Sequence, residues 1–269
     1  MDNKILFAFG LTLIAGLSTG IGSAIAFFAK KTNTKFLAVS LGFSAGVMIY
    51  VSMIEIFAKA QDSLTAELGL KAGSWAAAVS FFGGMLLIAI IDKLVPNEEN
   101  PHHLHNIEEF NESNVHPENY NLVRTGMFTA LAVGIHNFPE GIATFISALQ
   151  EPTIAIPITV AIAIHNIPEG ISISAPIYYA TGDRKKAFKY SFLSGLAEPI
   201  GALIGYFVLM PFLSDMVFGV VFGMVAGIMV YISLDELLPS AQKYGEHHLS
   251  IGGLIAGMAV MAVSLLMFI

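Results

Sequence analysis

Apolar stretches of about 20 residues recur along the whole chain, and they limit its fold more than any other feature. A helix of that length is long enough to cross the hydrocarbon core of a bilayer. Only 12% of the 269 residues are charged, whereas a water-soluble domain carries roughly a quarter charged residues. We therefore predict an integral membrane protein embedded in the lipid bilayer, with no nucleic-acid partner.

Eight such stretches can be marked, and each is predicted to form one transmembrane helix. They are too long for membrane β-strands and lack the alternation of a barrel, whereas a helix satisfies its own backbone amides. The predicted fold is an all-α integral membrane protein in which residues 1–269 form a single polytopic domain. The predicted spans are 5–28, 36–58, 74–94, 124–148, 153–180, 187–209, 216–238 and 249–269.

The basic residues predict which way these helices run. Lys and Arg accumulate in the short cytoplasmic loops of membrane proteins. Ten of the thirteen basic residues lie in the odd-numbered loops, and three lie on the other side of the membrane. We therefore predict cytoplasmic odd-numbered loops and external N- and C-termini. The ten are Lys30, Lys31, Lys35, Lys93, Arg124, Arg184, Lys185, Lys186, Lys189 and Lys243, and the three are Lys4, Lys59 and Lys71.

One connection, residues 95–123, is much longer than the others, and it is polar, acidic and rich in Asn and His. It is predicted to be a flexible cytoplasmic loop between the third and fourth spans. Two interpretations of its histidines stay open, because they can bind metal weakly to sense or deliver it, or simply belong to a solvated loop. They are His102, His103, His105 and His116.

Two sequence patterns each occur twice. The first is HNFPEG (136–141) and HNIPEG (165–170), and the second is GVMIYVSMIEI (46–56) and GIMVYISLDEL (227–237). In each pair one copy lies on an even-numbered span and the other on an odd-numbered span, so the copies cross the membrane in opposite directions. We therefore predict inverted repeats, an architecture in which secondary transporters bind substrate near the membrane midplane.

The repeated motif contains side chains that suit a metal ion. His136 and Glu140 are four residues apart and share one helical face, as do His165 and Glu169. Two facing helices can present both imidazoles and both carboxylates to one point, a set suited to a divalent transition metal. The chain has no cysteine, so any metal site must use nitrogen and oxygen ligands.

Further polar residues and prolines lie close to this point in the sequence. Asn137 and Asn166 project about 100° around the helix from the histidines and can serve a neighbouring position, with the carboxylates shared. Pro139 and Pro168 each remove a backbone hydrogen bond and are predicted to kink their helices at the same depth. Glu198 lies at a similar depth in the sixth span.

Energetics favour an ion site over the alternative, a polar cluster that only holds helices together. Each charged carboxylate at the bilayer centre costs about 2.5 to 3.5 kcal/mol, and a divalent cation removes most of that cost. Other acids and hydroxyls fall near predicted helix ends, where they would either raise the local cation concentration or be ordinary interfacial groups. They are Ser52, Glu55, Asp92, Ser233, Asp235 and Glu236.

The motif pair, the eight spans, the external termini and the histidine-bearing loop resemble the ZIP (Zrt/Irt-like) metal transporters. The similarity extends over essentially the whole chain and looks closest to a bacterial branch. It implies import of zinc, iron(II), manganese or cobalt, with cadmium a further candidate, across a bacterial inner (plasma) membrane, and it suggests a homodimer. The implied ligands of one metal are His136, Glu140, His165 and Glu169, and those of a second are Asn137, Asn166 and Glu198, with Glu140 and Glu169 bridging.

Two other functions fit the same residues. One is an intramembrane metal-dependent hydrolase, in which a metal activates water beside a free glutamate base. The acids here are symmetric and all look like ligands, so we predict no enzyme activity and no resident cofactor. The other is a metal-selective channel, which differs from a carrier only in kinetics.

Overall fold

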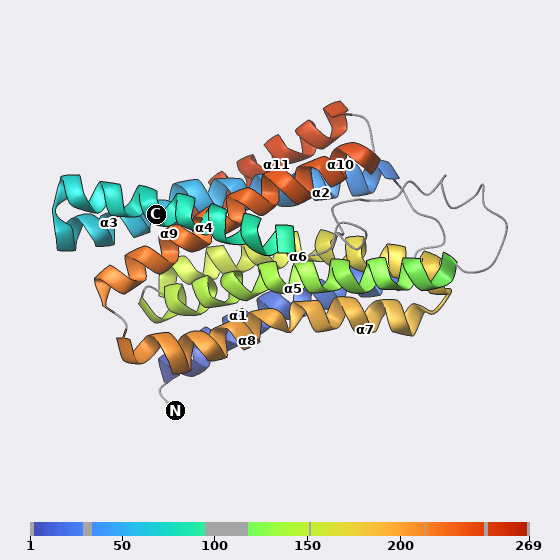
Figure 1. Ribbon diagram of the computed structural model, residues 1–269, viewed down its shortest axis with the longest axis horizontal. Coiled ribbons are helices and arrows are strands. Elements are labelled where there is room, and N and C mark those ends of the chain that lie inside the picture. Colours follow the sequence, from blue (N-terminus) through green and yellow to red (C-terminus); the bar gives the residue numbers. More distant parts are fainter. Residues whose placement is uncertain are drawn as a thin grey trace.

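The computed structural model describes residues 3–28, 34–94, 118–150, 152–212, 214–244 and 247–267, and every regular element in these ranges is a helix. The helices run mainly along the long axis of an elongated bundle (Figure 1). The elements are α1 (Asn3–Phe28), α2 (Thr34–Val51), η1 (Ser52–Ile56), α3 (Phe57–Leu68), α4 (Leu70–Leu94), α5 (Glu118–Gln150), α6 (Pro152–Thr181), α7 (Arg184–Gly195), α8 (Ala197–Ile204), η2 (Gly205–Leu209), η3 (Met210–Phe212), α9 (Asp215–Ile232), η4 (Ser233–Leu237), α10 (Leu238–Tyr244) and α11 (His247–Leu266).

The prediction of an all-α membrane protein is confirmed for the described part of the chain. Six helical segments there are long and apolar enough to cross a bilayer, and they correspond to predicted spans one, two, three, six, seven and eight. The fourth and fifth spans correspond to α5 and α6, which are not among the six, although α6 contains the shorter apolar stretch Ala155–Ile171. Large exposed side chains such as Trp75, Phe82 and Leu86 are apolar, as a surface in contact with lipid requires.

The second span is longer than predicted, and the predicted loop after residue 58 is wrong. The helix continues through η1 and α3 to Leu68, and Gly69 alone separates it from α4. Gly69 has a φ of 79°, a conformation that favours glycine. The polar composition of α3 is typical of a loop. The segment is helical because Ala60 and Leu64, four residues apart, form a buried face.

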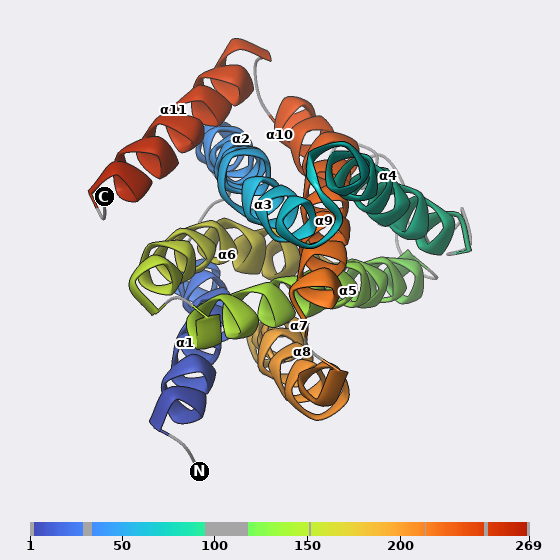
Figure 2. The same ribbon diagram turned by 90° about the vertical axis from the view of Figure 1, so that its left-hand side faces the viewer.

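The helices form two groups, which Figures 1 and 2 both show. One group contains α1, α5, α6, α7 and α8, and the other contains α2, α3, α4, α9, α10 and α11. The two groups meet chiefly where α2 and α11 pack against α6 and where α9 packs against α5. Both termini lie toward the same end of the long axis (Figure 1).

Two π-helical segments lie at the same place in the two copies of the second sequence pattern. Ser52–Ile56 and Ser233–Leu237 begin at the serine that follows Tyr-Val and Tyr-Ile, respectively. The matching residues therefore share an uncommon backbone conformation as well as a sequence. π-Helical turns of this kind occur frequently at functional sites.

Candidate metal-binding site

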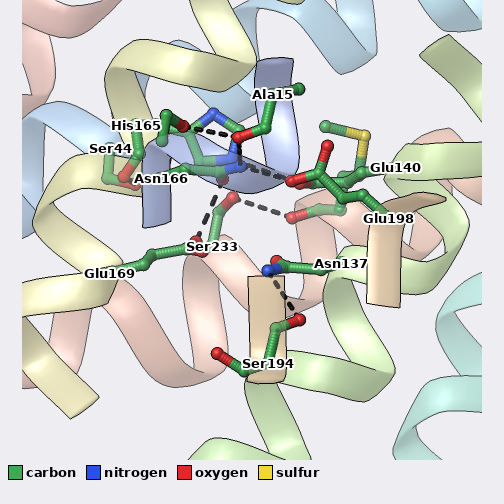
Figure 3. A network of polar contacts seen from close by, with 12 residues as sticks. Ala15, Ser44, Asn137, Glu140, His165, Asn166, Glu169, Ser194, Glu198 and Ser233 are labelled. Atoms are coloured by element: carbon green, nitrogen blue, oxygen red, sulfur yellow. Dashed lines mark hydrogen bonds and ion pairs between the residues drawn. The ribbon is translucent and has the colours of Figure 1, made fainter. Parts of the chain in front are cut away.

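Six polar side chains of the predicted site are completely buried inside the bundle. They come from α5, α6 and α8, with α5 packed against both of the other helices. Figure 3 shows them in one polar network. Each has an exposed fraction of 0%, and they are Asn137, Glu140, His165, Asn166, Glu169 and Glu198.

The imidazole of His165 connects the two copies of the motif. Its Nε2 lies 3.3 Å from Glu140 Oε2 on α5 and 3.9 Å from Glu169 Oε1 one turn along α6. The four-residue spacing therefore places His165 and Glu169 on one face, and the packing of α5 on α6 adds Glu140. Helical structure continues through Pro139 and Pro168, whose rings cannot donate to Ile135 O and Ile164 O.

A proline also sets the position of Glu198. Pro199 has no N–H to donate to Gly195 O, and the helix is interrupted at Leu196, between α7 and α8. Glu198 lies in the first turn of α8, where its Oε1 accepts a hydrogen bond from Asn166 Nδ2. The carboxylate is thereby held next to the α6 copy of the motif.

Both asparagines use their amide N–H groups on backbone carbonyls of neighbouring helices. Asn166 Nδ2 donates to Ala15 O of α1 at 3.0 Å, and Asn137 Nδ2 donates to Ser194 O of α7 at 3.5 Å. Because the amide N–H groups make these bonds, the amide oxygens of both asparagines remain available to another ligand. Asn137 Oδ1, Asn166 Oδ1 and Glu198 Oε2 are buried and accept no hydrogen bond from any residue that the structure describes.

Buried oxygens without donors are costly, and a cation is the ligand that suits them. Carboxylate, amide and imidazole groups together form a set that binds several divalent ions. No three His, Asp or Glu side chains among those described are arranged to enclose a metal by themselves. The side chain of His136, the remaining predicted ligand, lies outside the described part, while its backbone belongs to α5 one turn before Glu140.

The glycine that ends each motif lets a neighbouring backbone approach closely. A Cβ at Gly141 would overlap the carbonyl oxygen of Glu198, and a Cβ at Gly170 would overlap the carbonyl oxygen of Thr19. The two glycines therefore bring α8 and α1 against the ends of the two motifs. This contact places Glu198 within reach of Asn166.

Comparison with known proteins identifies the family. The model of the ZIP zinc transporter family matches residues 92–265, which include both motifs and Glu198. The chain belongs to the ZIP family. It is 64% identical to the zinc transporter ZupT of Clostridium perfringens, over 99% of this chain and 98% of that protein. It is also 64% identical to the ZupT of Streptococcus mutans and 61% identical to that of Lysinibacillus sphaericus, in both cases over the full length of each chain.

Membership of the ZIP family makes the chain an integral membrane transporter and not an enzyme. The hydrolase interpretation is therefore dropped.

The residues predicted to lie near the two ends of a transport path differ from one another in their burial. Ser52 and Ser233 are both completely buried, and their helices continue beyond them to Leu68 and Tyr244.

The acids of this group lie nearer the surface. Glu55 is partly buried and pairs with Lys59 Nζ at 3.5 Å. Asp235 is exposed, and Asp92 is partly buried. Glu236 is partly buried. The loop histidines His102, His103, His105 and His116 lie outside the described residues.

Two serines of the polar network were not predicted to belong to it. The sequence analysis did not consider Ser44, and it placed Ser233 near a helix end. Ser44 of α2 is buried, and its Oγ contacts His165 O at 3.4 Å. Ser233 belongs to the network in Figure 3 and donates its hydroxyl to Met229 O at 2.7 Å. A single serine in an apolar helix is a weak signal, since it often bonds only to its own backbone.

Proposed function

We propose that this ZIP protein carries zinc and other divalent transition metals into the cytosol through the polar network of α5, α6 and α8. The observation that supports this most directly is the complete burial of six polar side chains in an apolar bundle. Three of these are carboxylates, which would cost about 8 to 10 kcal/mol as isolated charges at the bilayer centre. A divalent cation offsets that cost and gives the network a function.

The proposed site holds two ions. His136, Glu140, His165 and Glu169 bind one, while Asn137, Asn166 and Glu198 bind the other, and Glu140 and Glu169 bridge them. The distances from His165 Nε2 to Glu140 and Glu169 support the first position. The three buried oxygens that accept no hydrogen bond from described residues support the second. Mixed imidazole and oxygen ligands suit zinc, iron(II), cobalt and manganese.

We infer that the fold contains inverted repeats, with α5 and α6 as the fourth and fifth of eight crossings. The paired π-helical segments support this, because they occupy matching places in spans of opposite direction. The motif glycines support it too, since Gly141 lies against Glu198 of α8 and Gly170 lies against Thr19 of α1. Two helix groups of this kind suit alternating access, in which one group moves against the other.

The orientation with external termini and the homodimer also remain predictions. The Lys and Arg bias supports the orientation. Accessibility of a terminal tag in intact cells tests the orientation, and crosslinking in native membranes tests the dimer. Metal sensing by the loop histidines is tested by deleting residues 98–116 and comparing uptake at low and high external zinc.

Purified protein in liposomes that enclose a zinc-sensitive dye is expected to take up zinc with a rate that saturates as external zinc rises. Iron(II), manganese and cobalt are expected to compete. A rate that rises linearly over the whole concentration range would indicate a channel, and absence of flux above protein-free liposomes would overturn the proposal. An imposed pH gradient shows whether protons move with the metal.

His165→Ala is expected to lower the rate of uptake and change metal preference without eliminating transport. The substitution removes one of the two proposed imidazole ligands, so the remaining set is richer in oxygen and should favour hard ions such as manganese over zinc. Competition between zinc and manganese for uptake measures this change. An unaltered ratio of the two apparent affinities would remove His165 from the site.

A further inference from the structure

The hydroxyl of Thr19 on α1 is buried without the hydrogen bond that many helical threonines make, as is that of Thr144 on α5. Buried threonines in helices commonly donate their hydroxyl to the carbonyl four residues back, as Thr12 does to Ala8 O at 3.0 Å and Thr159 does to Ala155 O at 2.7 Å. For Thr19 that carbonyl is Ala15 O, which accepts from Asn166 Nδ2 and from Ser18 Oγ instead. Thr19 Oγ1 is fully buried and has no hydrogen-bond partner among the residues that the structure describes.

The sequence around Thr19 matches the sequence around Glu198. AGLSTGIGSAI (15–25) and SGLAEPIGALI (194–204) share the spacing of a Gly-Leu pair, an Ile-Gly pair and a final isoleucine. Thr19 occupies the place of Glu198 in this comparison. The two segments lie on α1 and on α7 and α8, which belong to the first and sixth spans and therefore run in opposite directions.

The contacts of the two segments also match. A Cβ at Gly16 would overlap Gly195 O, and a Cβ at Gly195 would overlap Gly16 O, so these two backbones meet reciprocally. Asn166 donates to Ala15 O and Asn137 donates to Ser194 O, and these two carbonyls occupy equivalent places in the two segments.

The equivalence extends to the middle of each metal-binding motif. A Cβ at Gly22 would overlap Ile167 O, and a Cβ at Gly201 would overlap Phe138 O, which is the same position in the other copy of the motif. A pseudo-twofold axis between Gly16 and Gly195 therefore relates Thr19 to Glu198 and Asn137 to Asn166.

We propose that Thr19 and Asn137 form a further oxygen subsite for the transported divalent cation, equivalent to the pair of Glu198 and Asn166 but uncharged. Asn137 is shared between this subsite and the second ion position. Thr19 Oγ1 and Asn137 Oδ1 are both buried without a described hydrogen-bond partner. Both side chains lie against the same short segment, because Asn137 contacts Ser194 O and the Thr19 side chain packs on Gly195. The proposal rests on the proposed metal transport.

The difference in charge gives the two subsites different tasks. Two neutral oxygens hold a divalent cation more weakly than a carboxylate does, and an ion that must pass through needs a position from which it can leave. On the predicted orientation α1 runs inward, so Thr19 lies on the cytoplasmic side of Gly16, whereas Glu198 lies on the external side of Gly195. The carboxylate subsite captures the ion and the neutral subsite releases it.

Thr19→Val, which removes the hydroxyl and keeps the shape, is expected to lower the maximal rate of zinc uptake into liposomes at least about fivefold, with little change in KM. Thr12→Val is the matched control, because Thr12 is equally buried in the same helix and its hydroxyl bonds only to its own backbone. That control is expected to transport at the parental rate. Thr19→Ser should recover most of the rate and Thr19→Ala should not, which decides the question even if the valine variant fails to fold.

An exchange of the two residues separates a subsite from a packing role. Glu198→Thr should lose most zinc binding and uptake, and the double variant Glu198→Thr/Thr19→Glu should recover a substantial part of the zinc bound by the purified protein, because the carboxylate returns at the equivalent place. Its uptake should stay low, because the carboxylate then lies on the release side. The subsite would be overturned by a parental uptake rate in Thr19→Val or by an equal loss of uptake in Thr12→Val. It would also be overturned if a well-folded double variant recovered no zinc binding. Absence of zinc flux in the parent protein would instead overturn the proposed function.

Discussion

Glu140→Ala and Glu169→Ala are each expected to reduce zinc uptake at least about 100-fold, to the level of protein-free liposomes. Both carboxylates are completely buried, and both lie close to His165 Nε2. In the proposed site each of them bridges two ions, so its loss weakens both positions. Removing a buried carboxylate also removes a charge that is costly in the membrane, and the variants should therefore still insert and accumulate.

Uptake per amount of protein in the membrane measures this effect, with zinc bound by the purified protein as a second measurement. Glu67→Ala is a suitable control, because Glu67 is an exposed acid near the end of α3. It should transport zinc like the parent protein. Normal uptake in both the Glu140 and the Glu169 variant would remove these residues from the transport path.

Gly141→Ala is expected to destabilise the bundle strongly and to abolish transport. The added Cβ would overlap the backbone carbonyl oxygen of Glu198, which belongs to another helix and has no rotamer by which to move away. Overpacking of this kind costs about 3 kcal/mol, and relief requires α8 to move away from α5. That movement also takes Glu198 away from Asn166.

Gly134→Ala in the same helix is the matched control. A Cβ there would meet its nearest neighbours at 4.0 Å, an ordinary van der Waals distance. The thermal unfolding midpoint of the purified protein in detergent, measured with and without zinc, compares the two variants. A Gly141 variant that unfolds at the same temperature as the Gly134 variant would show that the close contact is not required.

Much of the fold follows from hydropathy, a local property of the chain. Six of the predicted spans can be recognised from their own residues in the described part of the chain, because crossing a bilayer requires a long apolar helix whatever its neighbours are. The ends of the spans were harder to predict, as the extension of the second span to Leu68 shows. Polar residues of α3 are compatible with a loop or with an amphipathic helix, and the packing of Ala60 and Leu64 decides between them.

The sequence by itself determined the candidate ligands, because the spacing of HNFPEG and HNIPEG places His and Glu on one face of any helix that forms there. The tertiary structure decided which groups the motif residues meet. Ala15 O, Ser194 O and Ser44, which contact Asn166, Asn137 and the His165 carbonyl, belong to helices distant in sequence. It also decided that Thr19 lacks its usual acceptor. Hydrophobic periodicity and residue spacing act within one helix, whereas a contact between helices depends on how closely their backbones approach. Here glycines such as Gly16, Gly141 and Gly195 allow that close approach.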